Sequence, residues 1–367
     1  MKTPYLCLLA FCLPLLVVSQ SMQLVTGLSP ALSESSGLAF IGDKLFTHGD
    51  SGNDAVLFEI DTLTGNPSRT IAITGATNID WEDIQVSGDY LYIGDIGNND
   101  GTRTNLRFYR VLLTDILEPE NDAAAAEAIP YFYNDQTDFP SQPFATQFDA
   151  EAFIAVGQEI YIFTKNWDNE ETNVYYIGSL VGPQEALRIG SFDSQGLVTG
   201  AWYDSNENRA HLVGYTLLLQ SFTIAIDIDA DFSNGIFNPS RTSASAPNNY
   251  STQIEAITST GEGKYFVTAE QSVFFEPSGM YRFSDVVVGV NNAKELVGRI
   301  FPNPAIGMVH LDFQNFHRAE IFHSSGRLIY HVNQPQVNLS QWESGVYIVK
   351  VFDKNQVLVT NSRIAVH

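Results

Sequence analysis

The feature that most constrains the fold of this chain is a unit of three short strands that recurs along it. In each copy, a strand opens on a small or acidic residue, a glycine turn follows, and two further strands come after it. Repeats of this size cannot bury an apolar face alone and predict an all-β repeat fold. The copies lie at 35–61, 81–111, 150–178, 254–284 and, more weakly, 198–227.

The copies begin roughly 45–70 residues apart, which predicts a β-propeller of about five blades, with six as the alternative. Runs such as YLYIGD and EIYIFTK alternate with a period of two, and long helical patterns are nearly absent. One alanine-rich stretch, 118–130, is expected to form a short helix or an excursion loop. Residues 22–30 are expected to pair with the last strands and close the ring. A stacked β-solenoid is the structural rival.

The chain changes character after residues 284–298. The segment that follows is a run of short alternating strands with glycine turns. It predicts a small β-sandwich of about 70 residues, a size that can fold independently. We therefore expect a β-propeller at 22–288, a linker at 289–298 and a β-sandwich domain at 299–367.

The N-terminus has the layout of a secretory signal peptide. Lys2 precedes an apolar run from Tyr5 to Val18, and small polar residues follow, so residues 1–21 are expected to be removed on export. Both cysteines of the chain lie in this segment, which leaves the mature protein without a thiol. No later segment has the roughly 18 consecutive apolar residues of a membrane helix. The sequence predicts an exported, soluble protein.

The charge balance limits the classes of partner. The chain has 42 acidic and 19 basic residues, and its formal net charge is −23. A polyanion is repelled by nucleic acid and by anionic membranes, so neither is expected as a partner. The charge is also typical of an exported protein that stays soluble, and we expect a monomer.

Aligning the repeats reveals a column of oxygen-bearing side chains at the start of each first strand. In a propeller the first strand lines the central channel, so these positions form a ring around the axis. The column contains Ser36, Glu82, Glu151, Thr199 and Glu255. Residues two positions earlier lie on the same strand face and are candidates for a second layer, namely Asp80, Asp149 and Gln253.

Carboxylates that are close together and partly dehydrated either become protonated or bind a cation. Ca²⁺ accepts six to eight oxygen ligands with loose geometry, whereas Zn²⁺ prefers the Cys and His ligands that the column lacks. We therefore expect a divalent cation, Ca²⁺, held by the column. Two alternatives remain open: a water-filled acidic channel, and a ring neutralised by Arg103, Arg107 or Lys165.

Two tight turns share the pattern G-D-x-G-N, at 49–53 and 94–98. Glycine supplies positive φ, and Asp and Asn bond to nearby amides, so a self-satisfied turn is predicted. The spacing of acidic residues after Asp95 does not match a calcium loop. The candidates for facing a ligand from the loops are Asp50, Asp95, Lys165 and Trp167. Asp83 and Asp100 have no counterpart in the other repeats.

The last fifth of the chain resembles the C-terminal sorting domain of the type IX secretion system. The resemblance rests on three short motifs. The first is Pro302, Asn303 and Pro304, the second is Gly326 followed by Arg327, and the third is Gly345 and Tyr347 on either side of a valine. The resemblance implies passage through the periplasm, recognition by the type IX machinery, and a secreted or cell-surface destination in the Bacteroidetes lineage.

The string DWEDIQVSGDYLYIGDIGNN, with FDAEAF and QIEAI, resembles secreted bacterial β-propellers of uncharacterised function across residues 34–284. The column itself is more loosely similar to that of calcium-activated nucleotidases, which are propellers with hydroxyl and glutamate residues on their inner strands. The column is not accompanied by a cluster of basic residues that could bind phosphate. The sequence also contains no serine-hydrolase, zinc-protease or P-loop motif. No catalytic residue is therefore assigned.

Two classes of function stay open. The first is a binding or scaffold propeller that has a cation in its channel and recognises an unknown extracellular ligand. The second is a metal-dependent extracellular hydrolase that acts on phosphoesters or glycans at the channel mouth. Paired carboxylates can hydrolyse glycosides, but here that is an analogy of fold alone. The first class is favoured.

Overall fold

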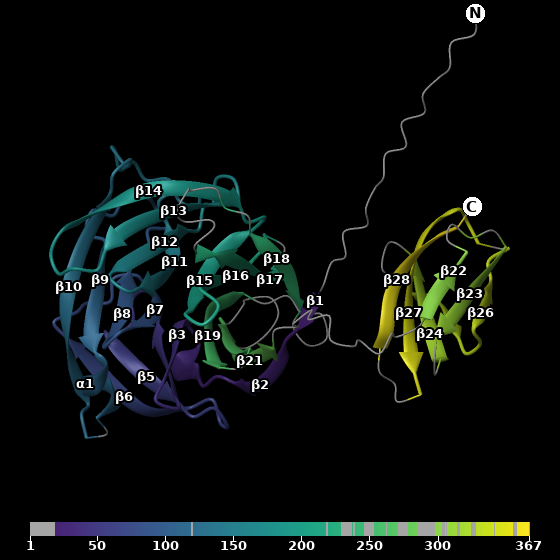
Figure 1. Ribbon diagram of the computed structural model, residues 1–367, viewed down its shortest axis with the longest axis horizontal. Coiled ribbons are helices and arrows are strands. Elements are labelled where there is room, and N and C mark those ends of the chain that lie inside the picture. Colours follow the sequence, from purple (N-terminus) through teal and green to yellow (C-terminus); the bar gives the residue numbers. More distant parts are fainter. Residues whose placement is uncertain are drawn as a thin grey trace, which may run out of the picture. The chain divides into compact units, whose positions relative to one another are not determined.

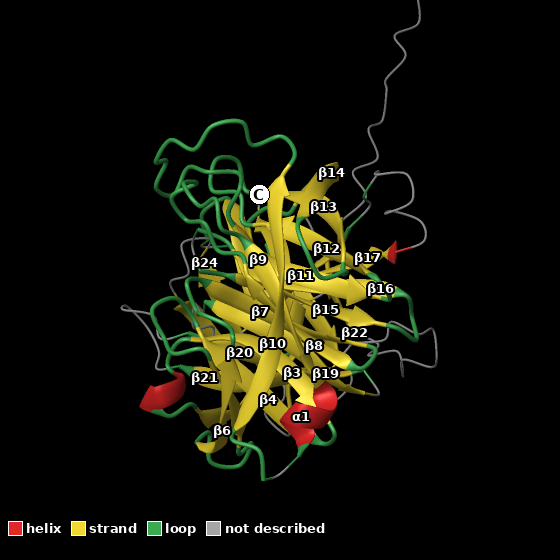
Figure 2. Ribbon diagram, turned by 90° about the vertical axis from the view of Figure 1, so that its left-hand side faces the viewer, coloured by secondary structure: helices red, strands yellow, loops and turns green. Residues whose placement is uncertain are grey.

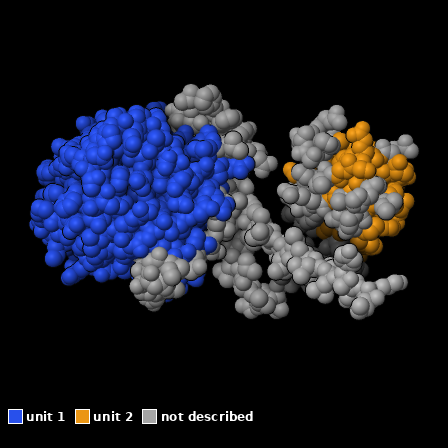
Figure 3. Space-filling view, turned by 90° about the horizontal axis from the view of Figure 1, so that it is seen from above, with its two compact units in different colours: residues 1–286 blue, residues 287–367 orange. Residues whose placement is uncertain are grey.

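The computed structural model describes residues 19–366, with gaps at 119, 218, 229–236, 238, 246–252, 262, 271–277, 285–297, 303, 304, 306, 314, 315, 324–327, 341 and 355–357. The chain divides into two compact units, residues 1–286 and 287–367, which Figure 3 colours separately. Most of the predicted signal peptide and of the predicted linker lies outside the described residues.

In the first unit, consecutive strands pair antiparallel in groups of four. Each group has its first strand innermost, as Figure 1 shows. The groups are β3 (Ser35–Ile41), β4 (Lys44–Gly49), β5 (Val56–Ile60) and β6 (Pro67–Thr74); β7 (Trp81–Ser87), β8 (Tyr90–Asp95), β9 (Arg107–Leu112) and β10 (Ala123–Tyr133); β11 (Ala150–Val156), β12 (Glu159–Thr164), β13 (Glu171–Gly178) and β14 (Gln184–Asp193); β15 (Leu197–Asp204), β16 (Arg209–Tyr215), β17 (Ser221–Asp227) and β18 (Ser240–Ser245); and β19 (Ile254–Gly261), β20 (Lys264–Ala269), β21 (Gly279–Ser284) and β2 (Gln23–Gly27).

The groups close into a ring. The N-terminal strand β2 pairs antiparallel with β21 and so completes the last group. The innermost strands contact one another in cyclic order, because β3 lies against β7, β7 against β11, β11 against β15, β15 against β19, and β19 against β3. A further strand, β1 (Ser19–Ser21), pairs parallel with β18. This arrangement is a β-propeller, and the predicted all-β propeller fold is confirmed.

The apolar core lies between the faces of adjacent blades. One cluster joins the first two groups through Phe46 and Trp81, which are fully buried. Another joins the second and third groups, where Phe108 packs on Phe153 with ring centroids 4.8 Å apart. Equivalent clusters occupy the remaining junctions. Each blade therefore buries both faces against its neighbours, which fixes the inner strands around the axis.

Most of the alanine-rich stretch at 118–130 forms a strand and not the predicted helix or loop. It belongs to β10 (Ala123–Tyr133), and a helical turn, α1 (Leu113–Leu117), precedes it. Alternate side chains of the second half of β10 are buried, from Ile129 onward. Backbone pairing with β9 and the apolar face of the blade outweigh the helix propensity of alanine.

The second unit is a two-sheet sandwich. One sheet contains β22 (Gly298–Phe301), β23 (Met308–Phe313) and β26 (Gln336–Asn338), and the other contains β25 (Leu328–Val332), β24 (Phe316–His323), β27 (Gly345–Asp353) and β28 (Leu358–Val366). Leu311, Ile321 and Val349 are among the fully buried residues of its core. The predicted small β-sandwich is present.

The sorting motif is only partly described. Pro302 is exposed, Gly345 opens β27, and the buried Tyr347 donates a hydrogen bond to the carbonyl of Glu343 at 2.8 Å. Asn303, Pro304 and Gly326 lie outside the described residues. Figure 2 shows that strands account for most of the described structure. Among the described residues, no helix is both long and apolar enough to cross a membrane.

Candidate functional site

The predicted column coincides with a β-bulge at the start of every innermost strand. The antiparallel register skips the single residues Glu82, Glu151, Thr199 and Glu255, and in the first blade it skips Ser36 together with Gly37. A bulge leaves its extra residue out of the strand ladder and redirects the side chain. The repeated bulge is therefore the local cause that turns these side chains away from the blade faces.

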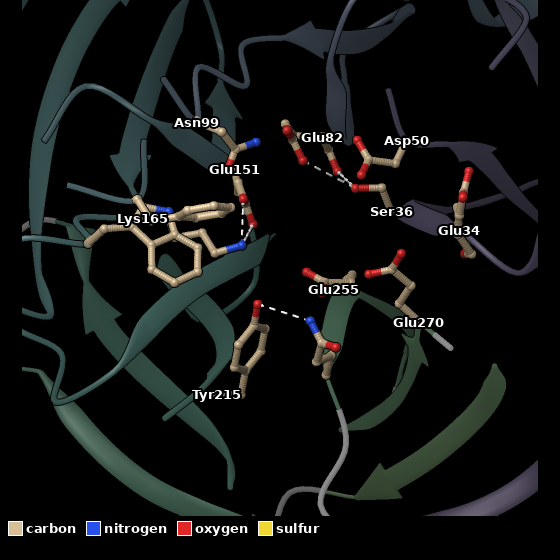
Figure 4. A pocket seen from close by; sticks show the side chains of 14 residues that line it. Glu34, Ser36, Asp50, Glu82, Asn99, Glu151, Lys165, Tyr215, Glu255 and Glu270 are labelled. Carbon is tan, nitrogen blue, oxygen red and sulfur yellow. Dashed lines mark hydrogen bonds and ion pairs between the residues drawn. The ribbon is translucent and has the colours of Figure 1, made fainter. Parts of the chain in front are cut away.

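A cavity of about 190 Å³ lies where these strands begin. Four members of the column line it: Ser36, Glu82, Glu151 and Glu255. Gln253, from the predicted second layer, lines it as well, and so do Asp50, Lys165 and Trp167 from the predicted ligand-facing loops. Figure 4 shows the side chains of Glu82, Glu151, Glu255 and Glu270 around a common space.

Thr199 is not part of the cavity lining. Its hydroxyl donates a short hydrogen bond to the carbonyl of Ile254, on the neighbouring strand β19. The side chain thus joins two inner strands and lies apart from the other members of the column, which line the cavity. The fourth blade therefore contributes no carboxylate or hydroxyl from the column to the cavity.

One wall of the cavity is built around a buried ammonium group. Lys165 Nζ donates to both carboxylate oxygens of Glu151, at 2.6 and 2.7 Å. The ring centroids of Trp167 and Tyr215 lie 5.0 and 5.5 Å from the same nitrogen. Burial by itself lowers the pKa of Lys165, but the attraction of Glu151 and other nearby acids raises it well above its usual range. Lys165 is therefore charged and neutralises one carboxylate of the column.

Asp149 supports this wall from behind. It is fully buried, and its carboxylate accepts hydrogen bonds from the Asn98 backbone N–H at 2.7 Å and from Trp167 Nε1 at 3.1 Å. These bonds fix the indole ring beneath Lys165. Asp149 acts as a positioning residue for the wall and does not line the cavity.

Asp50 and Glu82 line the opposite wall with Asp80 beside them, and none of the three forms an ion pair within the described part of the chain. Oxygen atoms of Asp50, Asp80 and Glu82 lie within 4.8 Å of one another. Glu82 is 4% exposed, and the Ser36 hydroxyl donates to its backbone carbonyl at 2.7 Å. A Cβ at position 97 would overlap Glu82 Oε1 and Asp80 Oδ2, so glycine is needed there for both carboxylates to approach the backbone.

The electrostatics of this wall follow from crowding and burial. Burial, followed by the charges of Asp50 and Asp149, raises the pKa of Asp80 to about 7. The same causes, burial first and Asp50 next, raise the pKa of Glu82 well above its usual range. Groups in this state are protonated near neutral pH or are stabilised as carboxylates by a cation.

Glu255 and Glu270 form a third part of the lining. Glu255 is 8% exposed, and no hydrogen-bond or ion-pair partner of its carboxylate exists within the described part of the chain. Burial raises the pKa of Glu255 to about 8 although Lys165 opposes the shift, and burial together with Asp50 and Glu34 raises that of Glu270 to about 7. Sequence alignment of the repeats did not identify Glu270, which follows the second strand of its blade.

Asp83, which has no counterpart in the other repeats, is a structural carboxylate. It is fully buried, and its oxygens accept hydrogen bonds from the backbone N–H groups of Ile84, Ala201 and Phe153 at 2.8, 3.1 and 3.4 Å. It therefore connects the inner strands β7, β15 and β11. Burial raises its pKa well above the usual range while these bonds oppose the shift.

Asp95 does not face a ligand. It is the last residue of β8, is fully buried, and accepts a hydrogen bond from Arg103 Nη2 at 2.7 Å. The sequence makes Asp95 a candidate for facing a ligand, but it does not line the cavity and instead pairs with Arg103. Asp50, at the equivalent place one blade earlier, has no arginine partner among the described residues and lines the cavity. The shared sequence pattern therefore has two different roles.

Comparison with protein families matches residues 299–366 to the secretion system C-terminal sorting domain. None of the curated proteins compared with the chain matches it in sequence. Several solved structures resemble it at low identity. One is PorZ, a surface component of the type-IX secretion system of Porphyromonas gingivalis, with 14% identity, a TM-score of 0.35 and coverage of 91% of this chain and 45% of that chain. The chain thus spans less than half the length of PorZ.

Two others are Kuenenia stuttgartiensis hydrazine synthase and the β-propeller domain of Myceliophteria thermophila Cps50 (Swd1). The first has 12% identity, a TM-score of 0.36 and coverage of 92% of this chain and 97% of that chain. The second has 11% identity, a TM-score of 0.32 and coverage of 88% and 95%. The family match is the more specific finding: residues 299–366 match the secretion system C-terminal sorting domain that the motifs of this segment predict.

Proposed function

We propose that this protein is a secreted or cell-surface binding propeller that is exported by the type IX secretion machinery and holds a divalent cation in its central cavity. The C-terminal sorting domain at 299–366 supports the route of export. The predicted signal peptide, 1–21, would carry the chain to the periplasm first. An extracellular ligand is expected to bind at the cavity.

The observation that carries the cation site is the group formed by Asp50, Asp80 and Glu82. Three carboxylates with oxygen atoms within 4.8 Å of one another repel strongly in a buried setting unless they are protonated or neutralised. Hard oxygen ligands of this kind suit Ca²⁺, which tolerates irregular geometry and water ligands. The described residues of the cavity lining include neither Cys nor His, so a zinc site is disfavoured.

This set differs from the one that the repeat alignment predicts. Glu82 belongs to both sets, whereas Asp50 and Asp80 replace Glu151, Glu255 and the two hydroxyls as the proposed ligands. Glu151 is already neutralised by Lys165. The same ion pair weakens the case for the hydrolase alternative, since Lys165 is the basic side chain among the described lining residues and it already bonds to Glu151.

Calorimetry of the EDTA-treated protein tests this proposal. Added Ca²⁺ is expected to bind at one site and to raise the melting temperature, because it stabilises carboxylates that otherwise repel. Glu82→Gln should abolish the heat and the shift. Glu185→Gln removes a charge from the exposed outer strand β14 and serves as the matched control that retains both. Absence of binding by the unaltered protein, or equal binding by the Glu82→Gln variant, would contradict the site.

A further inference from the structure

A second region of the cavity lacks the positive charge that its carboxylates require. Glu255 and Glu270 come from the blade that the N-terminal strand completes, and Figure 4 shows both side chains directed into the same space. Glu255 is only 8% exposed, and no described residue forms a hydrogen bond or ion pair with its carboxylate. A buried, unpaired carboxylate is costly, which points to a ligand that supplies the missing donor groups.

The arrangement of these two residues suits an ammonium group better than a metal ion. Among the described residues, Asp50, Asp80 and Glu82 form a group of three whose oxygen atoms lie within 4.8 Å of one another, and neither Glu255 nor Glu270 belongs to such a group. Glu255 and Glu270 supply two carboxylates, fewer ligands than the six to eight oxygens that Ca²⁺ prefers. An alkylammonium group has three N–H donors and can bond to two carboxylates at once.

The chain itself demonstrates how this cavity holds an ammonium group. Lys165 Nζ lies between the oxygens of Glu151 and the ring faces of Trp167 and Tyr215, a combination of charged hydrogen bonds and cation–π contacts. Tyr215 also borders the part of the cavity near Glu255, and its hydroxyl accepts a hydrogen bond from Gln253 Nε2 at 3.3 Å. Phe144, which is 64% exposed, lines the same cavity and packs edge-to-face on Trp167 at 5.2 Å. Phe144 and Trp167 therefore offer an apolar surface against which the aliphatic stem of an alkylammonium ligand can pack.

We propose that the cavity binds a primary alkylammonium group between Glu255 and Glu270, with its stem directed past Phe144 to solvent. The chemistry fits a free polyamine and also the lysine side chain of an extracellular protein. This site is separate from the proposed cation group at Asp50, Asp80 and Glu82 and goes beyond it. The net charge of −23 attracts either kind of cation to the protein.

The full-length protein is titrated by calorimetry with cadaverine and, as a neutral isostere, with pentanediol, in excess Ca²⁺ and in excess EDTA. Cadaverine is expected to bind at one site in both solutions, and pentanediol is not. Glu255→Gln should weaken cadaverine binding by about tenfold or more, because a charge-assisted hydrogen bond is lost. Glu185→Gln, on the exposed outer strand, should leave it unchanged. Capped peptides with lysine or norleucine then show whether protein-borne amines also enter.

Equal binding of cadaverine and pentanediol, no binding at all, or unchanged affinity in Glu255→Gln would overturn the proposal. So would displacement of cadaverine by Ca²⁺ combined with loss of Ca²⁺ binding in Glu255→Gln, because Glu255 would then serve the metal. Circular dichroism checks that the variant folds, and Glu270→Gln gives the same test on a less buried residue. Failure of Ca²⁺ binding with retained cadaverine binding would contradict only the cation site.

Discussion

Glu82 and Glu151 occupy the same bulge position in neighbouring blades, yet the two walls of the cavity solve the burial of a carboxylate differently. Glu151 receives two charged hydrogen bonds from Lys165. Glu82 faces Asp50 and Asp80 and receives no cation from the described chain. One wall is internally neutral, whereas the other accumulates negative charge. A repeated bulge therefore fixes where a side chain points, and the loops after the second strand decide what it meets.

Asp83 adds a third solution only one residue away from Glu82. It is as deeply buried, and backbone N–H groups from three inner strands compensate its charge. Its neighbours are fixed by the fold, so it stabilises the ring and leaves no room for a ligand. A buried carboxylate indicates a ligand site only where the described part of the chain supplies few compensating donors: Glu82 receives the Ser36 hydroxyl at 3.5 Å, and Glu255 receives no described donor.

The largest test of this comparison removes the ammonium group of the neutral wall. Lys165→Met leaves Glu151 buried without its partner and is expected to lower the free energy of unfolding by about 3 to 5 kcal/mol. The melting temperature should fall by roughly 10 °C. Lys44→Met removes a lysine whose ion pair with Glu59 at 2.9 Å is partly exposed, and should cost at most about 1 kcal/mol.

Thermal and denaturant unfolding measure both variants. If Lys165→Met costs no more than Lys44→Met, Glu151 does not depend on its ion pair and the two walls are alike.

The next test applies one substitution to both walls. In the metal-free protein, Glu151→Gln leaves the buried Lys165 without its charged partner and is expected to lower the free energy of unfolding by about 2 kcal/mol. Glu82→Gln removes repulsion between like charges and should raise the free energy of unfolding by about 1 kcal/mol. The two substitutions are therefore expected to change the free energy of unfolding in opposite directions, as measured by urea unfolding in EDTA. Changes of the same sign would break the distinction between the walls.

The smallest effect is the pH dependence of the unpaired carboxylates. The folded-state pKa values of Glu255 and Glu270, about 8 and about 7, exceed the usual pKa of a glutamate. At a pH between the usual pKa and these raised values, the folded chain therefore holds more protons than the unfolded chain. Stability in EDTA should therefore fall as pH rises, by about 1 kcal/mol between about pH 7 and pH 8.

Excess cadaverine should reduce this fall, because Glu255 and Glu270 are the proposed partners of an alkylammonium group and carboxylates that bind a cation no longer need the proton. Melting curves at the two pH values check both statements. Stability that rises with pH in EDTA would mean that these carboxylates are already compensated.

Much of the fold could be predicted from the sequence because the propeller repeats its own pattern. Alternation with a period of two gave the strands, and recurrence of the unit at 35–61 and 81–111 gave the blades. The stretch 118–130 misled because alanine favours helices locally, whereas pairing of β10 with β9 depends on residues that are not adjacent in the sequence. Propensity is a weak guide where tertiary pairing decides.

The candidate site was partly predictable for the same reason. Alignment identified Glu82, Glu151 and Glu255, since equivalent positions in a repeat fall at equivalent distances from the axis. It could not separate Asp50 from Asp95, because both stand in the same G-D-x-G-N pattern. Only the fold brings Arg103 to Asp95 and leaves Asp50 in the cavity.

The sequence by itself determined that this protein is an all-β propeller with a C-terminal sorting domain, because hydrophobic period, turn residues and motif spacing are local properties. The tertiary structure alone decided which buried acid pairs with Lys165, which is held by backbone N–H groups and which stays uncompensated. Those outcomes depend on distances between strands from different blades, and the electrostatic energy of a buried carboxylate is set by the few ångströms around it.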